Sequence, residues 1–486
     1  MRLRAVQVLG IAMGLGLYVY YAAWVMPVLT LVFGLYLFVF DRPRFKRAWL
    51  GLLIALVVAG AIFFPLGWDL AHGPRVTRIE VTGAPFRALL EGNPRPAIET
   101  TLGTLGMFTF AGDPEWLYNF SGLPVFDWIT GIAFYLGLLI CLVRLRETRY
   151  GFVLAWLVVG LSPAFISVPP ASYSHTIAAQ GAVYLLPALA LSQIPSTQYR
   201  IPYRKWVLGI GCLAFVAWVA WYTYHYYFDW WPNHAMVRFQ YHADTRDLAR
   251  WLDAQTKGGD LAISTTGTQL APRPLPLEPL ALSLDLKRQD IAPRWFDGTW
   301  ALVFPNGGGG RIALLSFPHL NPLIEPLLPG PIAEYHNPPT NQLAFQVYQD
   351  STAPGSRGTA PANATAFDSK LTLLSATVPT LPPREGGDGF LLTTWRVDGS
   401  LNVPLKIFAH LLDSSGQIIG NDDRLDVLVE SLRPGDVFVQ ISRLPRPAGA
   451  TCAPCRVRIG VYNSDTGQRL RTPASDNIVL PIEVRP

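Results

Sequence analysis

The sequence predicts a multi-pass α-helical membrane domain of about seven spans, followed by an exported small α/β domain and a C-terminal β-sandwich. Half of the 486 residues are hydrophobic and only 15% are charged, against roughly 25% charged in an ordinary soluble domain. The long uncharged runs end near residue 225, and short apolar segments separated by turn residues follow. This composition excludes a single water-soluble enzyme. The formal net charge of +5 is too small to indicate a nucleic-acid partner.

The predicted spans are apolar runs in the first 225 residues. The run Ala5–Phe40 contains no charged residue and has room for two spans of about 20 residues each, with Pro27 near the turn between them. Five further runs follow, at Ala48–Trp68, Phe126–Val143, Phe152–Val168, Ala178–Ile194 and Trp206–Tyr224. A signal peptide would be shorter and followed by a polar chain. A soluble helical core rarely contains uncharged runs of this length.

Lys and Arg in the short loops predict the orientation of these spans. The cationic clusters lie at Met1–Arg4, Arg42–Arg47, Arg144–Arg149 and Tyr199–Lys205. Their alternation predicts a multi-pass protein of the plasma membrane, with a cytoplasmic N-terminus and extracytoplasmic C-terminal domains. The aromatic segment Trp221–Trp231 is typical of the outer membrane interface.

The predicted domain boundaries follow changes in composition. Residues 1–225 form the membrane domain, which includes a long outer loop at 69–125. This loop is too long for a plain connector and is either a substrate mouth or a solvated cap. Residues 226–350 form the α/β domain, with an amphipathic helix at His242–Thr256. Its strand-like runs are Asp260–Ser264, Thr299–Phe304, Arg311–Leu315 and Gln342–Tyr348.

The last part of the chain has a different texture. Residues 351–366 are rich in Ser, Ala, Gly, Thr and Pro and are interpreted as a linker. Residues 367–486 contain short strands with turn signals between them, which predicts the β-sandwich. The Gly-rich segment Asn306–Gly310 lacks the Lys and Ser/Thr of a phosphate-binding loop, so a turn is expected there.

Residues in the predicted sandwich invite functional interpretations beside structural ones. Cys452 and Cys455 form a Cys-Ala-Pro-Cys before a strand, which favours a local disulfide over a redox motif or a zinc site. No metal site is predicted. Asp413, Asp422 and Asp423 match no EF-hand spacing, so a polar turn is expected rather than calcium. The candidate glycan-binding aromatic side chains are Trp395, Phe408, His410 and Tyr462, although strand alternation places at least half of them in the core.

Several stretches together resemble one family. They are Gly106–Gly131 (GMFTFAGDPEWLYNFSGLPVFDWITG), Tyr226–Leu252 with its YYFDWW and ARWL, Trp395–Asp423 and Arg458–Leu470. The chain resembles the membrane half and exported tail of GT-C glycosyltransferases, in the branch of the protein O-mannosyltransferases and aminoarabinose transferases. The resemblance covers most of the chain, but no stretch is a catalytic signature by itself.

The resemblance implies transfer of a sugar from a polyprenyl-phosphate donor to a glycan or protein acceptor outside the membrane. Cationic side chains on the outer side can hold the lipid phosphate. The candidates are Arg75, Arg78, Arg87 and His175, each of which can also serve as an interfacial anchor. No motif requires a cofactor, and the donor phosphate is compatible with a divalent cation.

The chain departs from the family at its first outer turn. Members carry an acidic residue there, whereas Tyr21–Pro27 contains none. The sequence therefore predicts a fragment or degenerate copy whose catalytic acid is supplied upstream or by a partner. Asp113 and Glu115 are external acid/base candidates, although they match the family's non-catalytic outer loop. The alternative is a non-catalytic anchored envelope protein that displays a glycan- or protein-binding sandwich. An ion-coupled transporter is disfavoured, because the spans lack charged residues in their centres.

Overall fold

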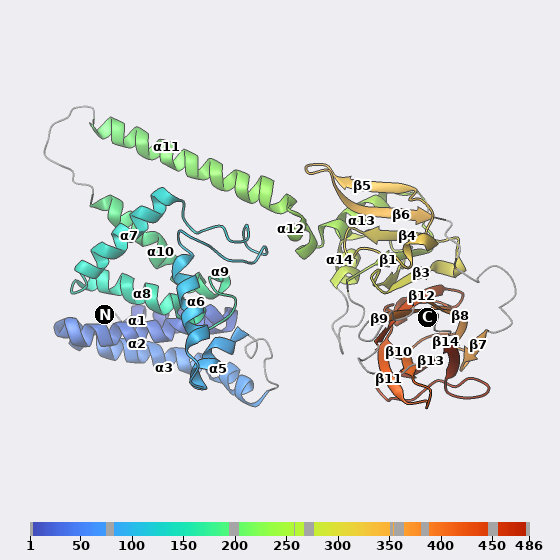
Figure 1. Cartoon of the computed structure of the whole chain (residues 1–486). Coiled ribbons are helices and arrows are strands. Elements are labelled where there is room, and N and C mark those ends of the chain that lie inside the picture. The colour runs from blue at the N-terminus through green and yellow to red at the C-terminus, as the bar shows by residue number, and fades with distance from the viewer. Residues whose placement is uncertain are drawn as a thin grey trace. The chain divides into compact units, whose positions relative to one another are not determined.

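The computed structural model of the chain divides into two compact units, Met1–Pro232 and Asn233–Pro486 (Figure 1). Each unit is described by itself. The structure describes residues 3–73, 82–193, 204–256, 258–266, 277–349, 353, 364–380, 388–445 and 455–482.

The first unit is helical throughout its described residues, apart from loops. Its helices are α1 (Leu3–Val19), α2 (Val25–Phe40), α3 (Arg42–His72), α5 (Ala84–Leu90), α6 (Arg95–Gly106), α7 (Trp128–Val143), α8 (Thr148–Phe165), α9 (Tyr173–Thr176), α10 (Gln180–Ser192) and α11 (Arg204–Tyr224). Side-chain caps fix two of the starts. Asp41 accepts a hydrogen bond from the Arg44 backbone N–H at the start of α3. Asp127 accepts from the N–H groups of Ile129 and Thr130 at the start of α7, as expected of N-cap residues.

Three of these helical segments are long and apolar enough to cross a membrane: Tyr21–Phe40, Arg42–His72 and Thr148–Phe165. The sequence predicted about seven spans. Helices α1, α7 and α10 contain 17, 16 and 13 residues. At a rise of 1.5 Å per residue they are about 20–26 Å long, less than the roughly 30 Å of a hydrocarbon core. The long uncharged runs thus correctly indicated apolar helices, but they did not show where each helix begins and ends.

Close contact between helices depends on small residues. A side chain at Gly137 of α7 would place its Cβ 1.9 Å from the Leu186 carbonyl oxygen of α10. At Gly160 of α8, the Cβ would lie 2.6 Å from the Cα of Ala179. Such contacts let backbones approach where lipid provides no hydrophobic drive between helices.

The second unit begins with a mixed sheet in the order β2-β1-β4-β6-β5. The strands are β1 (Leu261–Ser264), β2 (Arg294–Phe296), β4 (Arg311–Leu315), β5 (Ala333–Asn337) and β6 (Gln342–Gln349), and the helices beside them are α12 (Ala235–Gln240), α13 (Ala243–Ala254) and α14 (Leu277–Asp285). Strand β1 pairs in parallel with both β2 and β4. Leu248 and Leu252 of α13 are fully buried in the core formed with this sheet.

Two further sheets, both antiparallel, form the C-terminal β-rich region. One has the order β11-β10-β13-β14 and the other β3-β12-β9-β8-β7. Their strands are β3 (Ala301–Phe304), β7 (Thr365–Phe367), β8 (Leu371–Thr380), β9 (Asp388–Val397), β10 (Leu405–Leu412), β11 (Ile418–Arg424), β12 (Val437–Pro445), β13 (Cys455–Asn463) and β14 (Ile478–Ile482). Alternate residues of β10, such as Ile407 and Ala409, enter a core shared with Trp395 of β9.

Strand β3 lies in an unexpected sheet. The sequence placed Thr299–Phe304 among the strands of the α/β domain, but β3 pairs with β12, with Phe304 opposite Val437. All four residues of β3 are buried. A strand that is apolar on both faces carries no alternation that would identify its partner. The mixed sheet and the C-terminal β-rich region therefore share a core, which contains both Phe296 and Trp395.

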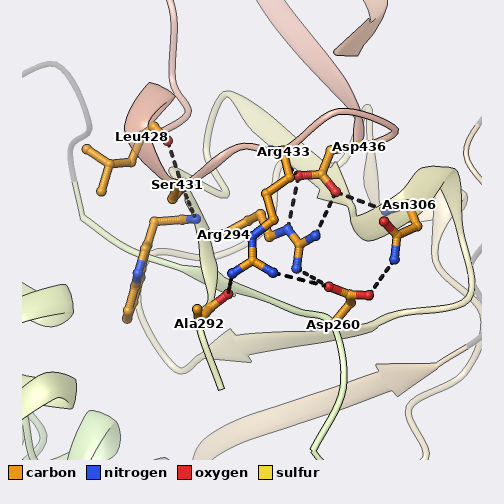
Figure 2. A network of polar contacts seen from close by, with 9 residues as sticks. Asp260, Ala292, Arg294, Asn306, Leu428, Ser431, Arg433 and Asp436 are labelled. Atoms are coloured by element: carbon orange, nitrogen blue, oxygen red, sulfur yellow. Dashed lines mark hydrogen bonds and ion pairs between the residues drawn. The ribbon is translucent and has the colours of Figure 1, made fainter. Parts of the chain in front are cut away.

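A buried ionic network joins these sheets (Figure 2). The Arg294 side chain is 1% exposed, and its Nε and Nη2 donate to the two carboxylate oxygens of Asp436, at 3.0 and 3.1 Å. Its Nη1 donates to Asp260. Asp436, fully buried, also accepts from the backbone N–H groups of Asn306 and Arg433. Asn306 begins the Gly-rich segment, which forms a turn here as predicted, with positive φ at Gly307, Gly308 and Gly309.

Candidate functional site

The part of the predicted outer loop that lies between α6 and α7 is a folded element. The Gly112 N–H donates to the Gly122 carbonyl, and the Gly122 N–H donates to the Asp113 carbonyl, at 3.0 and 2.7 Å. A Cβ at Gly112 would lie 1.9 Å from the Leu123 carbonyl oxygen. Only glycine therefore fits at position 112 without a shift of the loop backbone. We call residues 106–125 the outer hairpin.

Asp113 attaches the outer hairpin to the segment between α8 and α10. Its side chain is fully buried, with one oxygen accepting from the Glu115 N–H at 2.8 Å and the other from the Tyr173 N–H at 2.7 Å. The Tyr173 hydroxyl returns a hydrogen bond to the Leu123 carbonyl at 2.7 Å. Burial raises the pKa of Tyr173, so this hydroxyl stays protonated as a donor. Asp113 thus holds the backbone in place, whereas Glu115 is exposed.

His175 lies two residues beyond Tyr173 and is half-buried. Its Nδ1 is 2.9 Å from the Ser167 hydroxyl oxygen, and that hydroxyl lies 2.6 Å from the Pro163 carbonyl. A carbonyl only accepts, so the single Ser167 proton goes to Pro163. Nδ1 of His175 must then carry a proton and donate it to Ser167. This hydrogen bond fixes both the orientation and the tautomer of the imidazole.

The remaining predicted phosphate ligands are only partly placed. Arg75 and Arg78 lie outside the described residues. Arg87 lies on α5 with an exposed side chain. The Val168 N–H donates to the Thr82 carbonyl at 2.9 Å, so the segment that leads to Arg87 runs beside the one that leads to His175.

The aromatic segment after α11 also meets the outer hairpin. The Trp231 indole N–H donates to the Trp116 carbonyl at 2.9 Å, and the rings of Tyr226 and Phe120 are 5.5 Å apart. The hairpin, the His175 segment and the aromatic segment therefore form one polar and aromatic cluster, which we call the hairpin cluster. Sequence reasoning singled out the hairpin and His175 but missed Ser167 and Tyr173. The polar Ser-Tyr-Ser-His run between two apolar spans was the available signal.

The aromatic candidates of the β-rich region separate by strand alternation. Trp395 is fully buried in the shared core. Phe408 lies on the opposite face of its sheet from Ile407 and Ala409, and it is covered by the Arg469 guanidinium, 4.9 Å from the ring centre. On that face, Asp423 contacts both His410 and Tyr462 at 3.2 Å. The hydrogen bond from His410 is the main reason that the pKa of Asp423 is lowered.

The cysteine and acidic candidates of this region are placed as follows. Cys455 is disulfide-bonded, and Cys452 lies outside the described residues. Asp413 accepts from the backbone N–H groups of Ser415 and Gln417 at 2.9 and 2.8 Å, which is a polar turn. Within the described ranges, no group of three or more His, Cys, Asp or Glu side chains is arranged to hold a metal ion.

No family model matches the chain, and no curated protein matches it.

Proposed function

We propose that the chain is a GT-C-like membrane glycosyltransferase component. In this proposal it spans the plasma membrane about seven times, with the N-terminus cytoplasmic and the second unit outside. It binds a polyprenyl-phosphate sugar at the outer leaflet, and the sugar passes to a glycan or protein acceptor. The proposal rests on the resemblance carried by the outer hairpin and the exported tail. No acid/base residue is assigned among the described side chains.

One observation carries the proposal. Asp113 binds the Tyr173 backbone across 60 residues of sequence, so the stretch that resembles the family and the predicted phosphate ligand His175 belong to one cluster. The imidazole is oriented by its hydrogen bond to Ser167 through Nδ1, and its protonated form is a cation. An imidazolium donates charge-assisted hydrogen bonds to phosphate oxygens. A lipid-linked phosphate needs such a donor beside an apolar helical bundle.

The test is binding of undecaprenyl-phosphate mannose to the full chain in phospholipid nanodiscs. His175→Asn keeps an amide donor near the Nδ1 position but removes Nε2, whereas His175→Ala removes both. Both variants, and Arg87→Ala, should weaken binding about 10-fold, the cost of one charged hydrogen bond. The matched control is Arg95→Ala, an exposed outer-loop arginine paired with Glu99, which should bind normally. Equal binding by all five proteins would refute the proposal.

A second candidate function is an anchored envelope protein that displays a ligand-binding β-rich region. The observation that favours it is the polar face with His410, Asp423 and Tyr462. His410 Nδ1 and Arg458 Nε, on facing positions of β10 and β13, are buried without a hydrogen-bond partner among the described residues. If this second function is correct, Tyr462→Phe and Asp423→Asn should reduce the amount of cell-envelope polysaccharide that the chain retains. The unmodified chain should then not bind the lipid donor.

A further inference from the structure

The mixed sheet of the second unit has a topological switch point. Strand β1 lies between β2 and β4; the chain leaves β1 for β2 on one side, while β4 lies on the other side, and all three strands are parallel. Their carboxyl ends therefore meet at one edge. In open α/β sheets, ligands bind outside the carboxyl ends of the strands at such a point. At this edge, β1 continues into Thr265 and Thr266, and β4 continues into Ser316 and Phe317.

A buried carboxylate lies at this edge. The Glu278 side chain, in the first turn of α14, is only 5% exposed. The hydroxyl of Thr265 donates to one carboxylate oxygen at 2.9 Å, and the hydroxyl of Thr266 donates to the other at 2.5 Å. Neither a backbone N–H nor an arginine is recorded on this carboxylate in the described residues. Each oxygen therefore keeps capacity for a second donor.

His242 approaches the same carboxylate from the turn between α12 and α13. Its Nδ1 is 3.9 Å from the Glu278 Oε1, which is too long for a hydrogen bond. Its backbone is left-handed, with φ of 51° and ψ of 37°, a conformation that is unfavourable for a residue other than glycine. Strain of this kind persists where surrounding contacts impose it and is common at ligand sites.

The surrounding contacts connect this turn to the end of β4. The Ser316 hydroxyl donates to Asp244, whose other oxygen accepts from Arg238 at 2.7 Å. Beside them, Phe239 and Phe317 pack edge to face, with centroids 4.8 Å apart. Their exposed fractions are 36% and 48%. A half-exposed aromatic pair thus lies at the same edge of the sheet as the buried carboxylate.

We propose that this edge binds a neutral sugar. The acceptor oxygens of Glu278 would take sugar hydroxyl protons, and the exposed ring of Phe317 would cover the apolar C–H face of the same ring. Gln240, the last residue of α12 and the neighbour of Phe239 in sequence, adds a buried Oε1 without a hydrogen-bond partner among the described residues, which is another acceptor. An uncharged ligand with several hydroxyl donors can satisfy these acceptor oxygens. An anion would be repelled by Glu278 and Asp244.

The site lies within the second unit, and it serves either candidate function, as an acceptor subsite or as a glycan anchor. Its test is therefore independent of lipid-donor binding. The full chain is placed in phospholipid nanodiscs, because common detergents carry sugars. Saturation-transfer NMR then measures binding of methyl α-D-mannopyranoside and methyl α-D-glucopyranoside, with ethanolamine as a cationic probe. Transfer to at least one glycoside is expected.

Phe317→Ala should weaken the glycoside signal about five-fold, as expected for loss of one aromatic contact, and Glu278→Gln should abolish it. The matched controls are Ile332→Ala and Glu334→Gln, an exposed apolar and an exposed acidic position on or beside β5, which should change nothing. Phe317 is at the surface, so its variant tests the site even if Glu278→Gln fails to fold. Absence of transfer to both glycosides would overturn the proposal. Transfer only to ethanolamine, or a signal unchanged in Phe317→Ala, would also overturn it.

Discussion

Replacing Asp436 by asparagine should open the joint between the mixed sheet and the C-terminal β-rich region. Each Asp436 oxygen accepts two hydrogen bonds, one from Arg294 and one from a backbone N–H. An asparagine amide turns one of these acceptors into a donor, so two N–H groups lose their partner. Arg294, 1% exposed, then keeps Asp260 as its only ionic partner among the described residues. Breaking one side of a buried ion pair costs about 3–5 kcal/mol.

Hydrogen exchange of the full chain in nanodiscs measures this cost. Protection of the amides in β3 and β12 should fall by a factor between about 10² and 10⁴, since each 1.4 kcal/mol is tenfold. The control is Asp476→Asn, which breaks an ion pair with Arg469 in which both side chains are 42% exposed. It should cost less than about 1 kcal/mol. Equal loss of protection in the two variants would refute the view that burial makes the Asp436–Arg294 pair contribute more to stability than the exposed pair.

Three further predictions follow from the same kind of contact. Burial disfavours ionisation of Asp260, but the hydrogen bonds and charges of Arg294, Asn306 and Arg433 outweigh this effect and lower the pKa of Asp260. The stability that ionised Asp260 provides is therefore present above its unfolded pKa and is lost as the pH falls through its folded pKa. Asp260→Asn should accordingly make the free energy of unfolding less dependent on pH below about pH 4. Gly112→Ala should disrupt the outer hairpin and expose Trp116 to a fluorescence quencher, whereas Gly106→Ala, with open space around its Cβ, should not. Arg75→Ala or Arg78→Ala should weaken binding of a polyprenyl-phosphate sugar, and unchanged binding in both would remove these residues from the donor site.

Local patterns predicted the elements of this chain better than their partners. Strand alternation predicted that at least half of the four aromatic candidates lie in the core, and Trp395 and Phe408 are both buried. The partner of Asp436 is 142 residues away, and that of Asp113 is 60 residues away. No spacing rule reaches across such distances, because a carboxylate that binds backbone or arginine has the same sequence signature as an exposed one.

The same reasoning explains why the sequence predicted about seven spans although three of the described helical segments are long and apolar enough to cross a membrane, and why the sheet assignment of β3 was wrong. The hydropathy of a segment indicates whether it is surrounded by lipid or by water, whereas the number of spans also depends on where each helix begins and ends. Pro27 lies in the first turn of α2, next to the predicted turn between the first two helices, whereas Pro187 lies inside α10, so proline marked a helix end in one place and not in the other. Full burial of Ala301–Phe304 likewise hides which neighbour supplies the hydrogen bonds.

What distinguishes a ligand-binding acid from a structural one in this chain is the kind of donor it already holds. The described residues include four buried acidic side chains: Asp113, Glu278, Asp426 and Asp436. Asp113 and Asp436 accept hydrogen bonds from backbone N–H groups, and Asp426 accepts them from Arg424 and Gln440. A ligand that displaced these donors would leave them buried and unpaired, at a cost of about 1–3 kcal/mol for each donor. Glu278 holds threonine hydroxyls, which can rotate toward another acceptor without leaving a fixed donor orphaned. It is the one acid of this set that can exchange partners at low cost, and a sugar hydroxyl offers the same chemistry as the threonine that it would replace.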